Sequence, residues 1–255
     1  MRLHEKNIVT GDTYNNMKIK AVLFDLDGTL LPMDQNVFIK DYFKRLIGKV
    51  APYGYDPALL EKAIWKGSAA MVKNDGSRTN KEVFFDAFVA VMGEGIRQHF
   101  YVFDEFYQNE FDQVRHVCGN TPDADKVVKL VRSLGLTAVL ATNPLFPPEA
   151  TLARVRWAGL DADDFSLITT YDNSSYCKPN PAYYLTICET VGISPEECLM
   201  VGNDVGDDMI AGSIGMETFL LEDCLINPMK ENVDNYSHGS FAELEEKILK
   251  LSEIT

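Results

Sequence analysis

The sequence is poor in basic residues. Lysine and arginine together number 24 against 38 aspartates and glutamates, so the 255 residues carry a formal net charge of −14. Non-specific binding to nucleic acid requires basic patches that meet the phosphates, and an anionic membrane surface requires the same. We therefore expect neither nucleic acid nor membrane as a partner. A small anionic substrate stays compatible with this charge, because a metal ion and a few local cations can reverse the field inside one cleft.

Cysteine pairs, histidine clusters and long apolar runs are also lacking. The five cysteines form no Cys-x-x-Cys pair and do not group with the four histidines, which speaks against a zinc site or a disulfide framework. No stretch approaches the roughly 18 apolar residues of a membrane span, and residues 1–6 lack the apolar core of a signal peptide. The sequence therefore predicts a cytoplasmic protein with reduced thiols. Apolar residues still make up 46% of the chain, enough for a packed core.

Hydrophobic periodicity divides the chain into an α/β part and an all-helical insertion. After a first strand at 19–25, apolar residues at helix-like spacing predict helices at 36–50, 56–73, 80–92 and 98–114. From residue 120 the pattern alternates, with helices expected at 123–134, 148–158, 180–191, 206–213 and 241–252 and strands at 136–141, 165–170, 198–201 and 216–221. This alternation is typical of a doubly wound parallel sheet, a Rossmann-like core. We expect the core at 18–34 and 118–255, the insertion at 35–117, and a loose extension at 1–17.

Two acids stand directly after the first expected strand. Residues 21–24 are apolar and run into Asp25 and Asp27, which a Gly-Thr turn follows. Open α/β sheets bind ligands outside the carboxyl ends of their strands, and strand residues i and i+2 point to the same face. Two adjacent carboxylates would repel each other without a cation, and oxygen ligands favour a hard ion such as Mg²⁺. The alternative is that both acids only cap the following turn.

Three later segments carry polar side chains where the same edge of the sheet is expected. They contribute Thr142 with Asn143, Lys178, and Asp204 with Asp207 and Asp208. Carboxylates, a hydroxyl, an amide and an ammonium group together suit phosphoryl transfer, in which a carboxylate attacks phosphorus while donors and a cation hold the charged oxygens. The pattern therefore favours chemistry on a phosphate group.

Taken together, these segments resemble the haloacid dehalogenase-like hydrolase superfamily. Residues 24–30 (Phe-Asp-Leu-Asp-Gly-Thr-Leu) are similar to its first motif, Thr142 to its second, Lys178 to its third, and Asp204 with Asp208 to its fourth. The similarity runs through residues 19–221 in order and spacing. The helical insertion resembles the cap of the phosphoglycolate phosphatase-like branch, so the resemblance implies a hydrolase core with a helical cap at 35–117.

The resemblance also implies a role for each side chain. Asp25 would attack phosphorus and form an aspartyl-phosphate, while Asp27 would protonate the leaving alcohol and then activate the hydrolytic water. The side chain of Asp25, the backbone carbonyl of Asp27 and the side chain of Asp204 would bind Mg²⁺, with Asp208 supporting the metal shell or pairing with Lys178. The phosphoryl oxygens would be held by Thr142, Asn143 and Lys178.

The fourth motif departs from the family pattern. Many relatives have Gly-Asp where this chain has Gly202-Asn203-Asp204. We take Asp204 as the metal ligand and Asp208 as the second acid, with Asp207 as the alternative at the second position.

Asp27 indicates which bond is broken. By the resemblance, members that cleave carbon–halogen or carbon–phosphorus bonds lack this second acid, so its presence favours phosphate esters. The expected protein is a Mg²⁺-dependent phosphatase, a monomer or homodimer, that acts on a small phosphorylated metabolite. A sugar-phosphate mutase would keep both acids and the same cap. A catalytically silent binding protein on this fold is the weaker alternative.

Two features of the insertion each have a functional and a structural interpretation. Residues 73–81 form a polar, locally cationic connection whose Lys73 or Arg78 would reach the substrate when the cap closes, unless the connection is only an exposed loop. Nine aromatic residues between 84 and 111 occur at helical spacing, which is typical of a cap core, although some could line an apolar specificity pocket. Thr79 and Glu82 predict a capping box at the start of the helix at 80–92.

Overall fold

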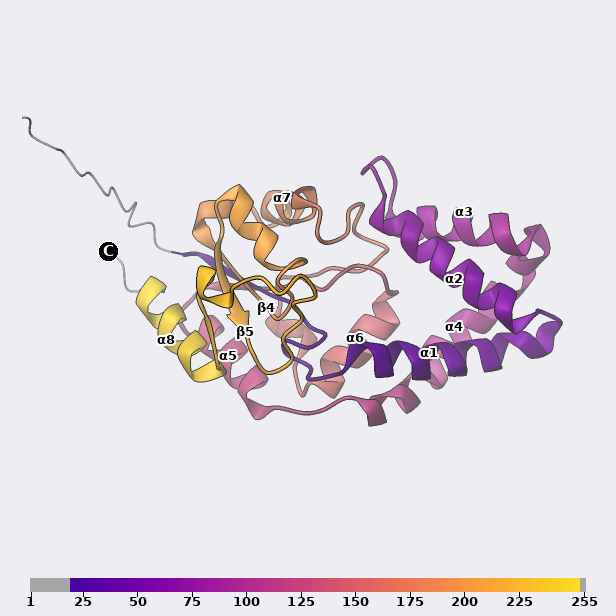
Figure 1. Cartoon of the computed structure of the whole chain (residues 1–255), viewed down its shortest axis with the longest axis horizontal. Helices are drawn as coiled ribbons and strands as arrows, with labels where there is room; N and C mark the ends of the chain where they lie inside the picture. The colour runs from indigo at the N-terminus through magenta and orange to yellow at the C-terminus, as the bar shows by residue number, and fades with distance from the viewer. Residues whose placement is uncertain (1–18, 253–255) are drawn as a thin grey trace, which may run out of the picture.

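The fold is a six-stranded sheet with helices on both faces and a group of further helices beside it (Figure 1). The structure, a computed structural model, describes residues 19–252, so the expected extension at 1–17 lies outside the described residues. The strands are β1 (Ala21–Phe24), β2 (Thr137–Leu140), β3 (Leu167–Ile168), β4 (Cys198–Gly202), β5 (Glu217–Leu221) and β6 (His238–Gly239). All pairings are parallel, and the order β3-β2-β1-β4-β5-β6 confirms the predicted doubly wound sheet. The short strand β6 was not predicted.

Strand β1 lies in the middle of the sheet because it is apolar on both faces. Val22 and Phe24 belong to one apolar cluster and Ala21 and Leu23 to another, and all four are fully buried. The first cluster includes residues of α5 (Pro122–Ser133), α6 (Pro148–Trp157) and α8 (Phe241–Ser252), and the second includes residues of α7 (Pro181–Val191). The sheet is thus held between two helical layers, which confirms the predicted alternation of strands and helices.

The insertion is helical, as predicted. It contains α1 (Gln35–Val50), α2 (Pro57–Val72), α3 (Asn80–Met92) and α4 (Phe100–Asn109), which gather at the end of the molecule away from α8 (Figure 1). The capping box of Thr79 and Glu82 is present at the start of α3. The helix expected at 98–114 is shorter, because 3₁₀ helices at Glu94–His99 and Phe111–Val117 flank α4. Apolar residues three apart suit both kinds of helix, so spacing alone did not separate them.

Aromatic side chains fill much of the core of the insertion. Phe88, Phe106 and Phe111 are fully buried and belong to the same apolar cluster as one face of the sheet. Gly67 of α2 permits close packing of α3, since a Cβ atom there would lie 2.4 Å from the ring of Phe84. The interpretation of these aromatic residues as core is therefore confirmed for the buried ones. Within the described residues, none of the helices has the length and apolarity to cross a membrane.

The helix expected at 206–213 is replaced by turns and a 3₁₀ helix at Met209–Ile214. Asp204 Oδ1 accepts from the N–H groups of Gly206 at 2.8 Å and Asp207 at 3.0 Å, and Asp208 Oδ2 accepts from the N–H of Asp204 at 3.0 Å. These bonds fix the loop that follows β4. The segment after the loop closes with i→i+3 bonds, such as that from the Ala211 N–H to the Asp208 carbonyl, which define a 3₁₀ helix.

Candidate active site

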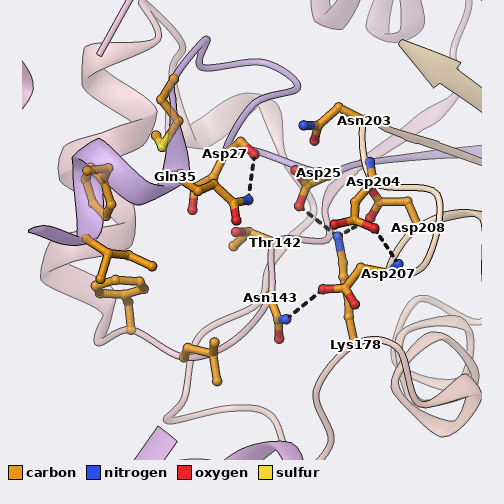
Figure 2. Close-up of a pocket in the computed structure, with 15 residues that line it drawn as sticks. Asp25, Asp27, Gln35, Thr142, Asn143, Lys178, Asn203, Asp204, Asp207 and Asp208 are labelled. Atoms are coloured by element: carbon orange, nitrogen blue, oxygen red, sulfur yellow. Dashed lines mark hydrogen bonds and ion pairs between the residues drawn. The ribbon is translucent and has the colours of Figure 1, made fainter. Parts of the chain in front are cut away.

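Three central strands of the sheet end at one cavity. Asp25 follows β1, Thr142 lies two residues after β2, and Asn203 follows β4. The strand order reverses between β1 and β4, and open α/β sheets bind ligands at such a switch point. A cavity of about 130 Å³ lies there (Figure 2), and its polar lining residues are Asp25, Asp27, Gln35, Thr142, Asn143, Lys178, Asn203, Asp204, Asp207 and Asp208.

The cavity thus unites the residues predicted from the sequence, except the cations of the connection at 73–81. Arg78 Nη1 lies 2.8 Å from Asp86 Oδ2 in an exposed ion pair, and neither Lys73 nor Arg78 is among the described residues that line the cavity. The connection that carries Arg78 does approach the core elsewhere, because the buried Asn80 side chain donates to the carbonyl oxygens of Pro144 and Tyr176.

Lys178 is held between two carboxylates. Its Nζ atom lies 2.7 Å from Asp25 Oδ1 and 2.7 Å from Asp208 Oδ1 (Figure 2). Lys178 and Asp208 are almost fully buried. Burial by itself would lower the pKa of Lys178, but the two adjacent carboxylates raise this pKa well above its ordinary value. The ammonium group therefore stays charged beside Asp25, where it can orient that carboxylate and attract an anion.

Asn203 accounts for the departure in the fourth motif. Its Nδ2 donates to the carbonyl oxygen of Cys224 at 2.6 Å, and its Oδ1 lies 3.0 Å from the Thr29 hydroxyl, which also lies 3.1 Å from Asp25 Oδ2. A carboxylate at this position could not donate to Cys224. Gly28, with φ of 94°, leaves room for the amide, since a Cβ atom there would lie 2.3 Å from Asn203 Nδ2. Asn203 therefore joins the loops after β1 and β4.

Asp207 and Asp208, the two candidates for the second acid of the fourth motif, have different partners. Asp208 accepts from Lys178, whereas Asp207 Oδ2 accepts from Asn143 Nδ2 at 3.3 Å. Burial raises the pKa of Asp207 above its ordinary value. Asp208 is consequently the acid that positions Lys178, and Asp207 is the acid that contacts the loop after β2.

Asp27 has a partner that the sequence reasoning missed. The guanidinium group of Arg154, on α6, forms an ion pair with Asp27 Oδ2 and is fully buried. It also donates to the Ala150 carbonyl at 3.2 Å and lies over the Phe146 ring, 4.3 Å from its centroid. An arginine on the buried, alanine-rich face of the predicted helix at 148–158 was the available signal. Burial raises the pKa of Asp27 to about 6, and Arg154 opposes this rise.

Two buried oxygens on the cavity wall have no hydrogen-bond partner among the described residues. They are Asp27 Oδ1 and Asn143 Oδ1. Buried polar atoms are normally paired, so these atoms mark places where a ligand, water or proton completes the site. The Asn143 amide donates to Asp207 (Figure 2), which leaves its oxygen rather than its nitrogen unpaired.

The donor atoms suit Mg²⁺. Within the described part of the chain, no three or more His, Cys, Asp or Glu side chains are arranged to hold a metal ion. The set expected from the sequence is smaller, namely the carboxylates of Asp25 and Asp204 with the backbone carbonyl of Asp27. Mg²⁺ is commonly bound by only one or two carboxylates and keeps several waters. Asp27 Oδ1 is buried and has no hydrogen-bond partner in the described part of the chain, and Asp27 lines the same cavity as these donors, which fits a polar ligand there.

Comparisons with known proteins match most of the chain. A sequence model of the haloacid dehalogenase-like hydrolases matches residues 19–214. The phosphoglycolate phosphatase of Neisseria gonorrhoeae is 30% identical over 200 residues, which are 77% of this chain and 77% of that protein. YhcW of Bacillus subtilis is 31% identical over 134 residues, which are 50% of this chain and 57% of YhcW. The crystal structure of 2-haloacid dehalogenase from Pseudomonas syringae pv. tomato has the same fold, with a TM-score of 0.59 at 18% identity, covering 91% of this chain and 99% of that one.

Proposed function

This chain belongs to the haloacid dehalogenase-like hydrolase family, and from that membership we propose that it hydrolyses a small phosphate monoester through an aspartyl-phosphate on Asp25. The observation that carries the proposal is the buried ion pair of 2.7 Å between Asp25 and Lys178, with Asp27 two residues away in the same cavity. The named activity of the relative from Neisseria gonorrhoeae supports a phosphate ester as the substrate.

The proposed reaction has two steps. Asp25 attacks phosphorus, the ester P–O bond breaks, and the leaving alkoxide takes a proton from Asp27. Water then attacks the aspartyl-phosphate and gives its proton to Asp27, which releases inorganic phosphate and restores Asp25. A pKa of about 6 at Asp27 supports both proton transfers, because each protonation state is accessible near neutral pH. Thr142 and Lys178 bind the phosphoryl oxygens, and Asn143 joins them through the second N–H of its amide, because its Oδ1 can only accept.

We propose that Mg²⁺ is held by the side chains of Asp25 and Asp204 and by the backbone carbonyl of Asp27. Bound there, it supplies positive charge that offsets both the aspartates and the incoming phosphate. Asp208 serves this arrangement through Lys178, which it contacts directly.

We further propose that residues 35–117 act as a cap over a hydrolase core formed by 18–34 and 118–255. Arg78 as a substrate contact stays a prediction, and it requires Arg78 to leave Asp86. An unchanged KM in Arg78→Ala for every accepted substrate would contradict it. The cytoplasmic location and the monomeric or homodimeric state stay predictions as well.

The proposal is tested by phosphate release from p-nitrophenyl phosphate with Mg²⁺, followed by a broad panel of phosphate monoesters. We expect turnover that Asp25→Asn abolishes, because an amide cannot form the aspartyl-phosphate. Removal of Mg²⁺ with EDTA should abolish it reversibly. Glu246→Gln, an exposed acid on α8, is the matched control and should keep full activity.

Other outcomes identify the alternatives. Interconversion of sugar phosphates without phosphate release would favour the mutase. If the intact protein turns over no member of the panel, the phosphatase proposal is wrong and the binding protein is favoured.

A further inference from the structure

A second cavity adjoins the candidate active site. We call it the aromatic cavity, after lining residues such as Tyr42, Phe43, Trp65, Phe84, Phe85 and Tyr171, and it measures about 110 Å³. Ile39, Leu145 and Phe146 line both this cavity and the candidate active site. A substrate with its phosphate at Asp25 therefore has the aromatic cavity as a neighbouring space for the rest of the molecule.

The wall of the aromatic cavity is apolar and lacks cations. Nine of its sixteen lining residues are aromatic, and none of those that the structure describes there is lysine, arginine or histidine. Its charged lining residue is Asp104, at an exposed position. The hydroxyl groups of Tyr42 and Tyr107 lie 2.5 Å apart, so one of them donates to the other. The wall offers an incoming group apolar contact far more than hydrogen bonds.

Trp65 is an unusual part of this wall. It is 49% exposed although it is large and apolar, and its ring centroid lies 5.1 Å from that of Phe43. Tryptophan gains much by burial, so a half-exposed tryptophan at a cavity suits contact with a bound apolar group.

We propose that the aromatic cavity binds the alcohol part of the substrate, and that the preferred substrates are monophosphates of apolar alcohols. An apolar cavity of ~150 Å³ holds one benzene molecule, so the aromatic cavity suits a group no larger than about one ring or a short branched chain. A carboxylate such as that of phosphoglycolate would be desolvated there without a cation and close to Asp104, which is unfavourable. This inference rests on the proposed phosphatase activity and departs from the substrate named for the relatives.

The test is a series of linear and branched alkyl phosphates from methyl to octyl, with phosphoglycolate and glycerol phosphate as polar members. Alkyl phosphates have leaving groups of similar basicity, so differences within the series report binding of the chain. We expect kcat/KM to rise about fourfold for each buried methylene, then to level off when the cavity is full. The values for 3-methylbutyl phosphate should exceed those for phosphoglycolate by at least tenfold.

Substitutions at Ser68 test whether the aromatic cavity is the space used. Ser68 of α2 is small and lines the cavity, so Ser68→Phe should fill it and lower the ratio of kcat/KM for 3-methylbutyl over methyl phosphate at least tenfold. Ser68→Arg places a cation there and should shift the preference towards phosphoglycolate. Ala69→Phe, at an exposed neighbouring position, is the control and should keep the ratio of the unmodified protein.

The outcomes separate this inference from the proposed function. If the unmodified protein releases no phosphate from any substrate, both the proposed function and the substrate class are overturned. Asp25-dependent turnover with a flat chain-length profile, or with phosphoglycolate preferred, would overturn the substrate class alone. A rising profile that Ser68→Phe and Ala69→Phe leave equally unchanged would overturn the aromatic cavity as the binding site.

Discussion

At the level of single residues, the pair of Arg154 and Asp27 determines how Asp27 faces the cavity. One carboxylate oxygen is held by a fully buried guanidinium group, and the other has no hydrogen-bond partner among residues 19–252. Arg154 contacts Asp27 and is not among the described residues that line the cavity, so it can act on the proposed reaction only through Asp27. We therefore assign Arg154 as a positioning residue for the acid proposed to protonate the leaving group.

We expect Arg154 substitutions to affect substrates according to their leaving groups. Proton donation by a general acid contributes about 10²–10⁴-fold to a rate, and p-nitrophenolate leaves without a proton. Arg154→Lys should therefore lower kcat for an alkyl phosphate far more than kcat for p-nitrophenyl phosphate. Arg154→Met removes the charge from a buried pair, which costs about 3–5 kcal/mol, so its folding must be checked by circular dichroism.

Asp27→Asn is the reference for this experiment, because it removes the acid itself and should give the same pattern. An equal loss on both substrates in Arg154→Lys would show that Arg154 is only structural. If Asp27→Asn lowers kcat equally for the alkyl phosphate and for p-nitrophenyl phosphate, Asp27 is not the acid that protonates the leaving group.

Residues that pair with sequence-distant partners mark the limit of prediction from the sequence. Asp25 and Asp27 were predicted from a local pattern, an apolar strand that runs into two acids and a turn. Lys178 was predicted only from the order and spacing of the four motifs together. Arg154 and Asp27 are 127 residues apart, and no spacing indicates their contact. Asn203 was seen only as a departure, because its partners Thr29 and Cys224 come together only in the folded chain.

At the level of elements, Asn80 connects the start of α3 by hydrogen bonds to two loops that carry residues of the candidate active site. Its Nδ2 lies 3.3 Å from the Pro144 carbonyl and 3.2 Å from the Tyr176 carbonyl, and its Oδ1 accepts from Asn74 at 2.9 Å. Pro144 directly follows Asn143, and Tyr176 lies two residues before Lys178. One buried side chain thus connects the insertion with two loops that carry site residues.

Asn80→Ala should therefore lower both stability and activity. Its partners would stay buried with unsatisfied polar groups, at a cost of about 1–3 kcal/mol in the free energy of unfolding measured with urea. Lys81→Ala is the matched control, because its 2.9 Å pair with Asp172 is exposed and should contribute no more than about 1 kcal/mol. Equal losses in the two variants would contradict the role assigned to Asn80.

Helices were predicted well where the helical spacing of apolar residues continues over several turns. Helices α1, α2 and α3 lie within a residue or two of the expected ranges, since each buries one apolar face along its length. The expected helix at 206–213 was wrong because the segment forms turns and then a 3₁₀ helix closed by i→i+3 bonds, such as that from the Ala211 N–H to the Asp208 carbonyl. Apolar spacing does not separate a 3₁₀ helix from an α-helix.

At the level of the whole molecule, the excess of acidic residues extends into the candidate site. The net charge is −14, and Asp25, Asp27, Asp204, Asp207 and Asp208 all line one cavity. Lys178 and Arg154 offset only part of this charge. A divalent cation held by the proposed ligands, Asp25 and Asp204, would stabilise the folded chain, because the unfolded chain does not bring these carboxylates together.

We therefore expect Mg²⁺ to raise the melting temperature. A ligand at 100 times its dissociation constant stabilises the folded state by about 2.7 kcal/mol. For a chain of this size that corresponds to a shift of roughly 5–10 °C in a calorimetric scan. Asp204→Asn should remove most of the shift, because it removes a carboxylate ligand, whereas Glu246→Gln on the exposed face of α8 should keep it. A shift that Asp204→Asn leaves intact would place the metal elsewhere, and no shift in the unmodified protein up to millimolar Mg²⁺ would contradict the metal site.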